Sequence, residues 1–315
     1  MDTFEAADGI TAIDTRMAGR RTVTSAYLLA GPEPTLIETG PTTSVEAVTA
    51  GLTTLGMGPE DLAHVVVTHI HLDHAGGVGS LAERFPRATV WVHHRGAPHL
   101  ADPTKLVQSA ARVYGEERLR QLFGPVDPVD ADRLRSMDDG DRITLGGRYL
   151  DVVHTPGHAS HQVALIDSQT GALFAGDALG IHLPDVGVLR PVTPPPEIDV
   201  EAAVASIGLI RDRATSLLMF SHFGPVDDPD AIRELCSLAA HRLVRWADIV
   251  REGMDRTEDL GEIATLLRTR TADDFAEVAE PDAATERYEL LATMEMNTAG
   301  LVRYWRKREE CEALS

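Results

Sequence analysis

The stretch 68–77 constrains this chain most, because it places three histidines and one aspartate within six consecutive positions. It follows the apolar run 65–67, which predicts a buried strand. Side chains alternate along a strand, so the first two histidines would point to one side, and a turn after Leu72 would bring the other two side chains round from another direction. The four residues are His69, His71, Asp73 and His74.

Imidazole and carboxylate donors without thiolates favour zinc as the bound metal, with manganese or iron as alternatives. One loop of this kind can present ligands to two adjacent divalent ions. Histidine makes up only 13 of the 315 residues, so chance clustering explains the pattern poorly. We therefore expect a metal-binding loop at the end of a buried strand.

The formal net charge of −20 argues against nucleic acid or an anionic membrane surface as a partner. The N-terminal residues lack a basic and then apolar signal segment, and no apolar run reaches the length of a membrane span. The two cysteines, Cys236 and Cys311, lie far from the histidines. We expect a cytoplasmic protein whose thiols form neither a disulfide nor a metal site.

Apolar patterning and turn residues predict an α/β protein followed by helices. We expect a strand meander at 10–14, 25–30 and 35–38, a helix over 44–55, and strands at 63–68, 89–93, 141–145, 148–154, 162–167, 172–176 and 216–221. The proline-rich segment 183–197 is expected to be a loop. Helices are expected over 78–85, 199–213, 229–252, 257–268 and 283–308.

Two units follow from this pattern. We expect one domain over 1–227, carrying a helical insertion at about 97–137, and an α-helical extension over 228–315. The apolar faces of the extension favour a homodimer.

Three more potential ligands come later in the chain, each near the end of an expected strand. His158 ends the sequence Thr-Pro-Gly-His, Asp177 follows Ala-Gly, and His222 follows Phe-Ser. Strand ends can converge on one edge of a sandwich of two sheets, so these side chains can meet the first cluster there.

This order of motifs resembles the metallo-β-lactamase-fold hydrolase superfamily over roughly residues 10–225. The resemblance implies a four-layer αββα sandwich with metals at one edge of the β layers. It also implies a first ion on His69, His71 and His158, and a second on Asp73, His74 and His222. Asp177 would bridge the two ions.

Departures from the family pattern reduce the number of family activities that this chain is expected to have. The true β-lactamases lack a bridging aspartate, RNA-processing members carry extra modules, and flavo-diiron proteins carry a flavodoxin domain. The relatives that remain are thioesterases resembling glyoxalase II, lactonases and persulfide dioxygenases, and the helical C-terminal extension makes the chain look most like the lactonase-like or glyoxalase-II-like members. The usual Asp-Thr-Gly is Glu38-Thr39-Gly40 here, so Glu38 would accept a hydrogen bond from a ligand histidine. Thr68 and His154 are expected to support the ligands in the same way.

Substrate contacts are harder to place. Quorum-type lactonases use a tyrosine between the bridging aspartate and the last histidine, and none occurs in that interval here. His182 is the expected substitute, and Arg190 the expected partner for a substrate carboxylate. His93, His94 and His99 are interpreted as polar loop residues.

The expected function is hydrolysis of a small ester, thioester or lactone by a hydroxide shared between two divalent ions. Asp73 is the expected catalytic residue, because a weakly held carboxylate could pass a proton to the leaving group. The alternatives are a mononuclear iron persulfide dioxygenase, which uses two histidines and one aspartate, and a non-catalytic metal-binding protein of the same fold.

Overall fold

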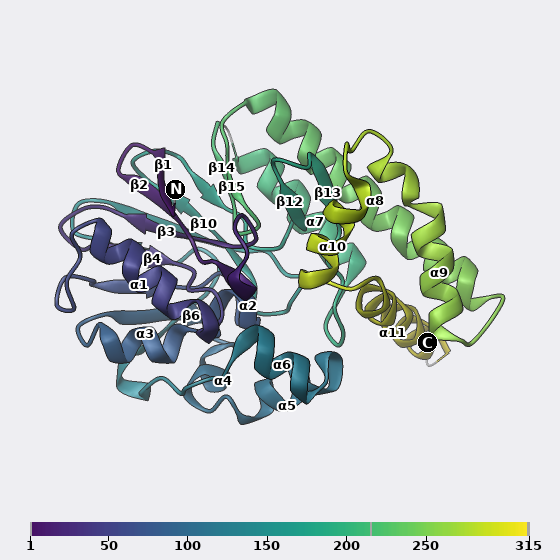
Figure 1. The fold of residues 1–315 in the computed structure, drawn as a ribbon, viewed down its shortest axis with the longest axis horizontal. Helices are drawn as coiled ribbons and strands as arrows, with labels where there is room; N and C mark the ends of the chain where they lie inside the picture. The colour runs from purple at the N-terminus through teal and green to yellow at the C-terminus, as the bar shows by residue number, and fades with distance from the viewer. Residues whose placement is uncertain (1, 215, 314–315) are drawn as a thin grey trace.

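The computed structural model describes residues 2–214 and 216–313 and contains two mixed sheets packed face to face (Figure 1). The first sheet has seven strands in sequence order, antiparallel from β1 to β4 and parallel from β4 to β7. They are β1 (Thr3–Ala7), β2 (Ile10–Asp14), β3 (Ser25–Leu29), β4 (Thr35–Ile37), β5 (His64–Val66), β6 (Thr89–His93) and β7 (Leu134–Met137).

The second sheet has six strands in the order β15-β14-β11-β10-β9-β8, and only the β11–β14 pair is parallel. A separate hairpin is formed by β12 and β13. The bounds are β8 (Arg142–Thr144), β9 (Tyr149–His154), β10 (Val163–Asp167), β11 (Leu173–Phe174), β12 (Ile181–Leu183), β13 (Val188–Arg190), β14 (Leu218–Phe220) and β15 (Gly224–Val226).

The helices are those between strands of the first sheet, those of an insertion, α7 between strands of the second part of the chain, and a C-terminal set that follows β15. The first group is α1 (Val45–Thr54), α2 (Leu72–Ala75) and α3 (Val78–Arg84), and the insertion contains α4 (Ala97–Ala101), α5 (Thr104–Tyr114) and α6 (Glu116–Phe123). The others are α7 (Val200–Arg213), α8 (Pro229–Met254), α9 (Leu260–Arg270), α10 (Pro281–Leu291) and α11 (Met294–Ala313). Short 3-10 turns lie at 17–19, 42–44, 131–133 and 272–275.

Side-chain alternation along the strands builds the layers. On β5, Val65 packs with α1 and α3 on the outer face of the first sheet, whereas Val66 faces the second sheet. On the second sheet, Leu165 of β10 faces inward, and Ala164 faces α7 and α8. The expected four-layer αββα sandwich with C-terminal helices is confirmed.

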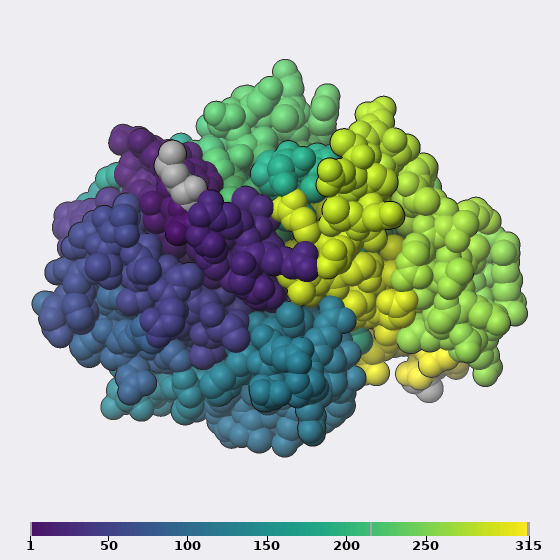
Figure 2. Space-filling model, in the orientation of Figure 1, coloured from purple at the N-terminus to yellow at the C-terminus, as the bar shows by residue number. Residues whose placement is uncertain are grey.

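The insertion, the β12–β13 hairpin and α10 gather over one edge of the sandwich, where they share a fourth apolar cluster. Arg287 of α10 donates to Thr22 O, and Arg118 of α6 donates to Glu289 O. Figure 2 shows the yellow C-terminal segment lying against the purple N-terminal segment and above the blue insertion. This edge holds the ends of the strands that carry the expected ligands.

Five details of the expected secondary structure were wrong, and one is that the expected strands did not include β15. Strand β1 precedes the expected meander, and β12 and β13 form a hairpin partly within the expected loop. The expected insertion ends in β7, which pairs with β6. The last expected helix is two helices, because Thr293 separates α10 from α11 and Glu289 accepts from Met294 N there. The division at residue 227 stays a prediction. In the described residues, no helix is long and apolar enough to cross a membrane.

A buried ion pair ties the second sheet to the first. Arg148, just before β9, donates two hydrogen bonds to Asp167 at 2.8 and 2.9 Å, and a third to Ala30 O at 3.0 Å. Both side chains are almost wholly buried. Removing one partner would leave the other charge buried without compensation.

We expect Asp167→Ala to lower the free energy of unfolding by about 3 kcal/mol. The control is Asp151→Ala, because its pair with Arg142 is exposed and should be worth less than about 1 kcal/mol. Denaturant unfolding of both variants measures the difference. Equal losses would contradict the role assigned to the buried pair.

Candidate metal centre

The seven expected ligands lie just beyond strand ends at one edge of the sandwich. His69 and His71 follow β5, and Asp73 and His74 lie on the short helix α2. The other three come from the second sheet, where His158 follows β9, Asp177 follows β11 and His222 follows β14.

Two glycines hold these loops close together. A Cβ at position 157 would lie 2.3 Å from Ala203 N and Cα, so Gly157, with φ +132°, lets the His158 loop approach α7. A Cβ at position 176 would lie 2.7 Å from Thr68 Oγ1, and Gly176 has φ +53°. Larger residues at either place would push a ligand loop away from the first cluster.

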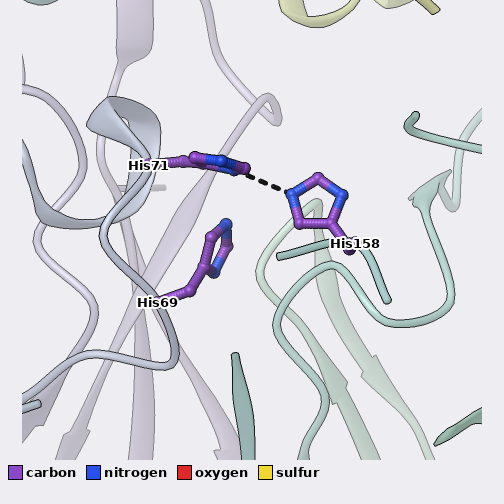
Figure 3. A group of neighbouring side chains, drawn as sticks. All are labelled: His69, His71 and His158. Carbon is purple, nitrogen blue, oxygen red and sulfur yellow. Dashed lines mark hydrogen bonds between the residues drawn. The ribbon is translucent and has the colours of Figure 1, made fainter. Parts of the chain in front are cut away.

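His69, His71 and His158 form the first cluster (Figure 3). The nitrogens His158 Nε2 and His71 Nδ1 are 2.8 Å apart, and the ring centroids of His69 lie 4.7 Å from His71 and 5.1 Å from His158. Three imidazoles facing one point from different elements match the donor set of a tetrahedral zinc site that keeps one position open.

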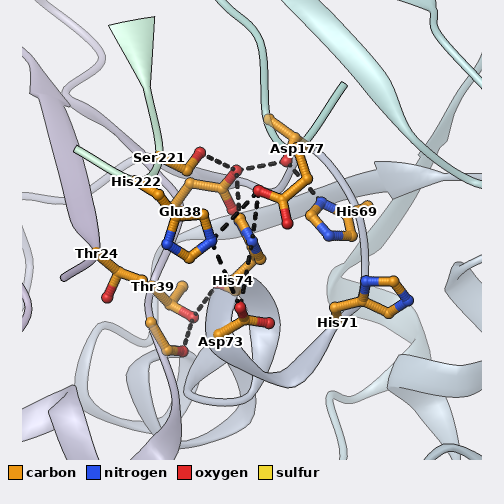
Figure 4. Close-up of polar contacts among 12 residues, drawn as sticks. Thr24, Glu38, Thr39, His69, His71, Asp73, His74, Asp177, Ser221 and His222 are labelled. Atoms are coloured by element: carbon orange, nitrogen blue, oxygen red, sulfur yellow. Dashed lines mark hydrogen bonds and ion pairs between the residues drawn. The ribbon is translucent and has the colours of Figure 1, made fainter. Parts of the chain in front are cut away.

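Asp73, His74, Asp177 and His222 form the second cluster (Figure 4). Asp177 Oδ1 lies 3.2 Å from His74 Nε2 and 3.3 Å from His222 Nε2. Asp73 Oδ2 lies 3.7 and 3.5 Å from the same two nitrogens. Two carboxylates and two imidazoles thus point at a common centre.

Asp177 connects the clusters, because its two oxygens face different ways. Oδ1 faces His74 and His222, whereas Oδ2 lies 3.6 Å from His158 Nε2 in the first cluster. A carboxylate placed in this way can bind two ions at once, one through each oxygen.

The outer nitrogens of two ligand rings donate to backbone carbonyls. His158 Nδ1 lies 3.0 Å from Val192 O, and His222 Nδ1 lies 3.0 Å from Val23 O. A carbonyl oxygen only accepts, so Nδ1 carries the proton in each bond. In a neutral ring, Nε2 then keeps its lone pair for an ion.

Glu38 and Thr68, which are expected to support the ligands, lie against two further rings. Thr68 donates to Glu38 Oε1 at 2.5 Å, so its oxygen accepts from His69 Nδ1 at 3.0 Å. Glu38 Oε1 also lies 3.5 Å from His74 Nδ1. Glu38 has φ +64°, a backbone conformation that non-glycine residues adopt rarely and that concentrates at functional sites.

A second observation also indicates that this donor set suits divalent ions. Buried polar atoms normally have hydrogen-bond partners. Within the described residues, four inward-pointing atoms are buried without one: His69 Nε2, His74 Nε2, Asp177 Oδ1 and His222 Nε2. Their convergence is what bound cations would require, although Asp177 Oδ1 also lies close enough to His74 and His222 to pair with them when they are protonated.

In the protein without bound metal, burial and the charges of neighbouring groups determine which of these side chains are protonated. Burial, followed by the charges of His158 and His161, lowers the pKa of His71 to about 3. Burial also lowers the pKa of His222, but the carboxylates of Asp177 and Asp73 outweigh it and raise the value to about 9. The first cluster therefore consists of neutral imidazoles, which is the form that binds metal.

A third group, His93, Asp138 and His154, also brings donor atoms within 4.8 Å of one another. The rings of His93 and His154 stack at 12° with centroids 4.7 Å apart, so their lone pairs run parallel and do not converge. The Asp138 side chain is 55% exposed. This geometry is poorer for an ion than either of the first two clusters.

The ligands open into a cavity of about 430 Å³, within the range of small-molecule sites. Five of the seven line it, namely His71, Asp73, His158, Asp177 and His222. Much of the remaining wall comes from the insertion, the loop after β13 and the helices α10 and α11, with further residues from β12 and from the loops that carry the ligands. A substrate in this cavity would lie directly against both clusters.

Three expected roles do not agree with the structure. Arg190 is buried, pairs with Glu289 at 2.7 Å and lies outside the cavity wall, so its charge is already matched by the protein. His182 also lies outside the wall and packs on Phe220. His154 contacts Ser160 O and stacks on His93, away from the seven ligands.

The cavity wall includes residues whose importance the sequence did not reveal. Tyr114 of α5 and His161 line it, as does His99, which was interpreted as a loop residue. His161 Nδ1 accepts from Ile70 N at 3.4 Å, and its ring centroid lies 5.7 Å from that of His71. In the sequence, apolar residues at helical spacing in α5 are the signal for part of this wall, and they do not show what that face covers.

Comparison with known proteins places these features in a family. The model of the Metallo-beta-lactamase superfamily matches residues 19–222. The chain is 29% identical over 171 residues to the metallo-beta-lactamase fold-containing protein ST1585 of Sulfurisphaera tokodaii, covering 53% of this chain and 62% of that protein. A crystal structure of ST1585 from Sulfolobus tokodaii superposes with a TM-score of 0.67 at 23% identity, over 93% and 98% of the two chains. That likeness shows the shared fold.

Two relatives with named activities match shorter segments. The hydroxyacylglutathione hydrolase of Aeromonas hydrophila is 32% identical over 116 residues, which are 36% of this chain and 32% of that enzyme. The acyl-coenzyme A thioesterase MBLAC2 of Gallus gallus is 36% identical over 130 residues, 39% of this chain and 44% of that enzyme. The chain thus spans less than two thirds of ST1585 and less than half of the two enzymes.

Proposed function

Because this chain belongs to the metallo-β-lactamase superfamily, we propose that it is a dinuclear metal-dependent hydrolase acting on a small ester, thioester or lactone. The observation that carries the proposal is Asp177, whose two oxygens face separate ligand clusters at the floor of one cavity. Two relatives are named as a hydroxyacylglutathione hydrolase and an acyl-coenzyme A thioesterase, and these names support an acyl bond, a thioester among them, as the bond that is hydrolysed.

The first cluster would hold one ion and the second cluster the other, with zinc as the expected metal and iron or manganese as alternatives. Bound ions would supply hydroxide at neutral pH and polarise the substrate carbonyl. The chain's own residues hold the rings of His158 and His222 in fixed tautomers through the carbonyl oxygens of Val192 and Val23.

Asp73 is the proposed proton carrier. Only one of its oxygens faces His74 and His222, and its side chain is 15% exposed to the cavity. The carboxylate can therefore take up a proton and deliver it to the leaving oxygen or sulfur.

We expect Asp73→Asn to lower kcat about a hundredfold while the protein keeps at least the ion of the first cluster. Metal content and steady-state rates measured on one preparation test this. Asp212→Asn, on the exposed end of α7, is the control and should change neither quantity. Full turnover by Asp73→Asn with both ions in place would remove the proton-carrier role.

The function itself is tested by stripping the protein with a chelator and restoring zinc, manganese or iron before assay on esters, thioesters and lactones. Hydrolysis that disappears with the metal and returns at two ions per chain supports the proposal. One iron per chain with oxygen consumption would support the persulfide dioxygenase instead. Metal uptake without turnover of any substrate class would favour a non-catalytic metal-binding protein.

A further inference from the structure

Helix α5 shows what kind of group the cavity accepts. Its apolar residues lie on one side and pack against the fourth apolar cluster, yet none of its eleven residues is fully buried. An amphipathic helix normally buries its apolar face against the core. Here Leu106, Ala110, Val113 and Tyr114 are only partly buried against that cluster and also line the cavity, so the rest of their apolar surface is available to a ligand.

The wall opposite α5 is also apolar. Ile181 of β12, Leu291 and Ala292 at the end of α10, and Met296 of α11 line it, and all four are buried. Phe123 of α6 contributes as well and packs on Tyr114 with centroids 5.0 Å apart. The chamber between these walls would stabilise a hydrocarbon chain by removing it from water.

Basic side chains collect on the cavity wall despite the strongly acidic composition. Arg95 and Lys105 line the cavity and are exposed, and His99 lies near them on the insertion. In the described part of the chain, no carboxylate lies within 4.0 Å of the charged nitrogens of Arg95 or Lys105, although Arg95 donates to Ser160 O at 3.3 Å and Lys105 is among the groups that lower the pKa of Asp102. Glu197 is the acidic residue among the exposed wall positions, and it already accepts from Ser160 N at 2.9 Å.

Resting on the proposed function, we infer that the substrate is a thioester whose apolar acyl chain enters the chamber beside α5 and whose thiol carrier bears anionic groups held by Arg95 and Lys105. An anion is costly to bury without a partner, so the charged carrier would stay at the exposed basic positions. Hydrolysis adds hydroxide to the acyl carbon, breaks the carbon–sulfur bond and gives a carboxylic acid, while the remaining proton goes to the thiol.

The carrier test compares thioesters with one acyl chain and different thiols. Octanoyl-coenzyme A carries phosphates, octanoyl-glutathione carries carboxylates, and octanoyl-N-acetylcysteamine is neutral. We expect a lower KM for one of the anionic thioesters than for the neutral one, and the better of the two identifies the anion. Equal KM values for all three would overturn the inference while leaving the hydrolase function intact.

Variants localise the effect. We expect the double variant Arg95→Gln, Lys105→Gln to raise KM for the preferred anionic thioester about threefold to tenfold and to leave the neutral one unchanged. Added salt should shrink the wild-type preference, because exposed charges are screened. The chain has only one other lysine, so Lys307→Gln on α11 is the matched control and should have no effect. An unchanged KM in the double variant would overturn the anion site.

The chamber is tested on the same helix. Ala110→Trp fills it and should raise KM for octanoyl more than for butanoyl thioesters, whereas Gln108→Trp, exposed and outside the wall, should not. An equal effect on both chain lengths would overturn the acyl chamber. If the metal-loaded protein hydrolyses none of the thioesters, neutral or charged, the proposed function fails and this inference fails with it.

Discussion

Replacing Asp177 by asparagine should abolish most hydrolysis, with kcat falling about a thousandfold, because one change weakens both ion sites at once. An amide keeps the size of the carboxylate but lacks the second negative oxygen that faces the first cluster. The loss should therefore exceed that caused by removing a residue that serves only one ion. Metal content should fall from two ions per chain to one or fewer.

The measurement combines elemental analysis of the purified protein with rates on a thioester. Circular dichroism shows that the variant remains folded, since Asp177 also balances the charges of His74 and His222. Asp212→Asn is the control for a remote aspartate. An Asp177→Asn protein with two ions and undiminished turnover would show that the carboxylate does not join the sites.

The second large effect concerns Glu38, which touches no cavity atom and acts through other residues. Glu38→Gln keeps the side chain's length but removes the charge that faces Thr68 and His74. We expect ion affinity to fall about tenfold to a hundredfold, which is typical for partners of ligand histidines. Added metal should restore most of kcat, since the ligands themselves remain.

Metal titration followed by activity at saturation separates these quantities. Glu33→Gln is a suitable control, because Glu33 also faces a histidine, His64, at the start of β5, where the Glu33 side chain is 46% exposed. A loss of kcat that saturating metal does not recover would contradict the positioning role and point to a direct one. Unchanged affinity would show that Glu38 does not orient the ligand rings.

The sequence predicted the fold and the ligand positions because their signals are local. Apolar runs followed by histidine or aspartate mark strand ends, and strand ends of a sandwich converge at one edge. Gly157 and Gly176 also sit beside their ligands in sequence, so close approach of the loops follows from short motifs. The seven side chains lie together as expected, and their binding of ions stays a prediction.

The segments that form the cavity wall could be expected, but the individual wall residues and their partners could not, because they depend on contacts between distant segments. Arg190 resembled a free carboxylate binder until Glu289, 99 positions later, was found beside it. Lys105 and Met296 are far apart in the sequence but line the same cavity. No proline or glycine marks the break at Thr293, where Glu289 accepts from the start of α11. Such pairings depend on tertiary packing and leave no periodic signal.

Anomalous X-ray scattering from crystals of the metal-loaded protein tests the central claim most directly. We predict two metal peaks, one among His69, His71 and His158 and one among Asp73, His74 and His222, with Asp177 contacting both. A single peak, or peaks at His93 and Asp138 with the two clusters empty, would contradict the dinuclear centre on which this account depends.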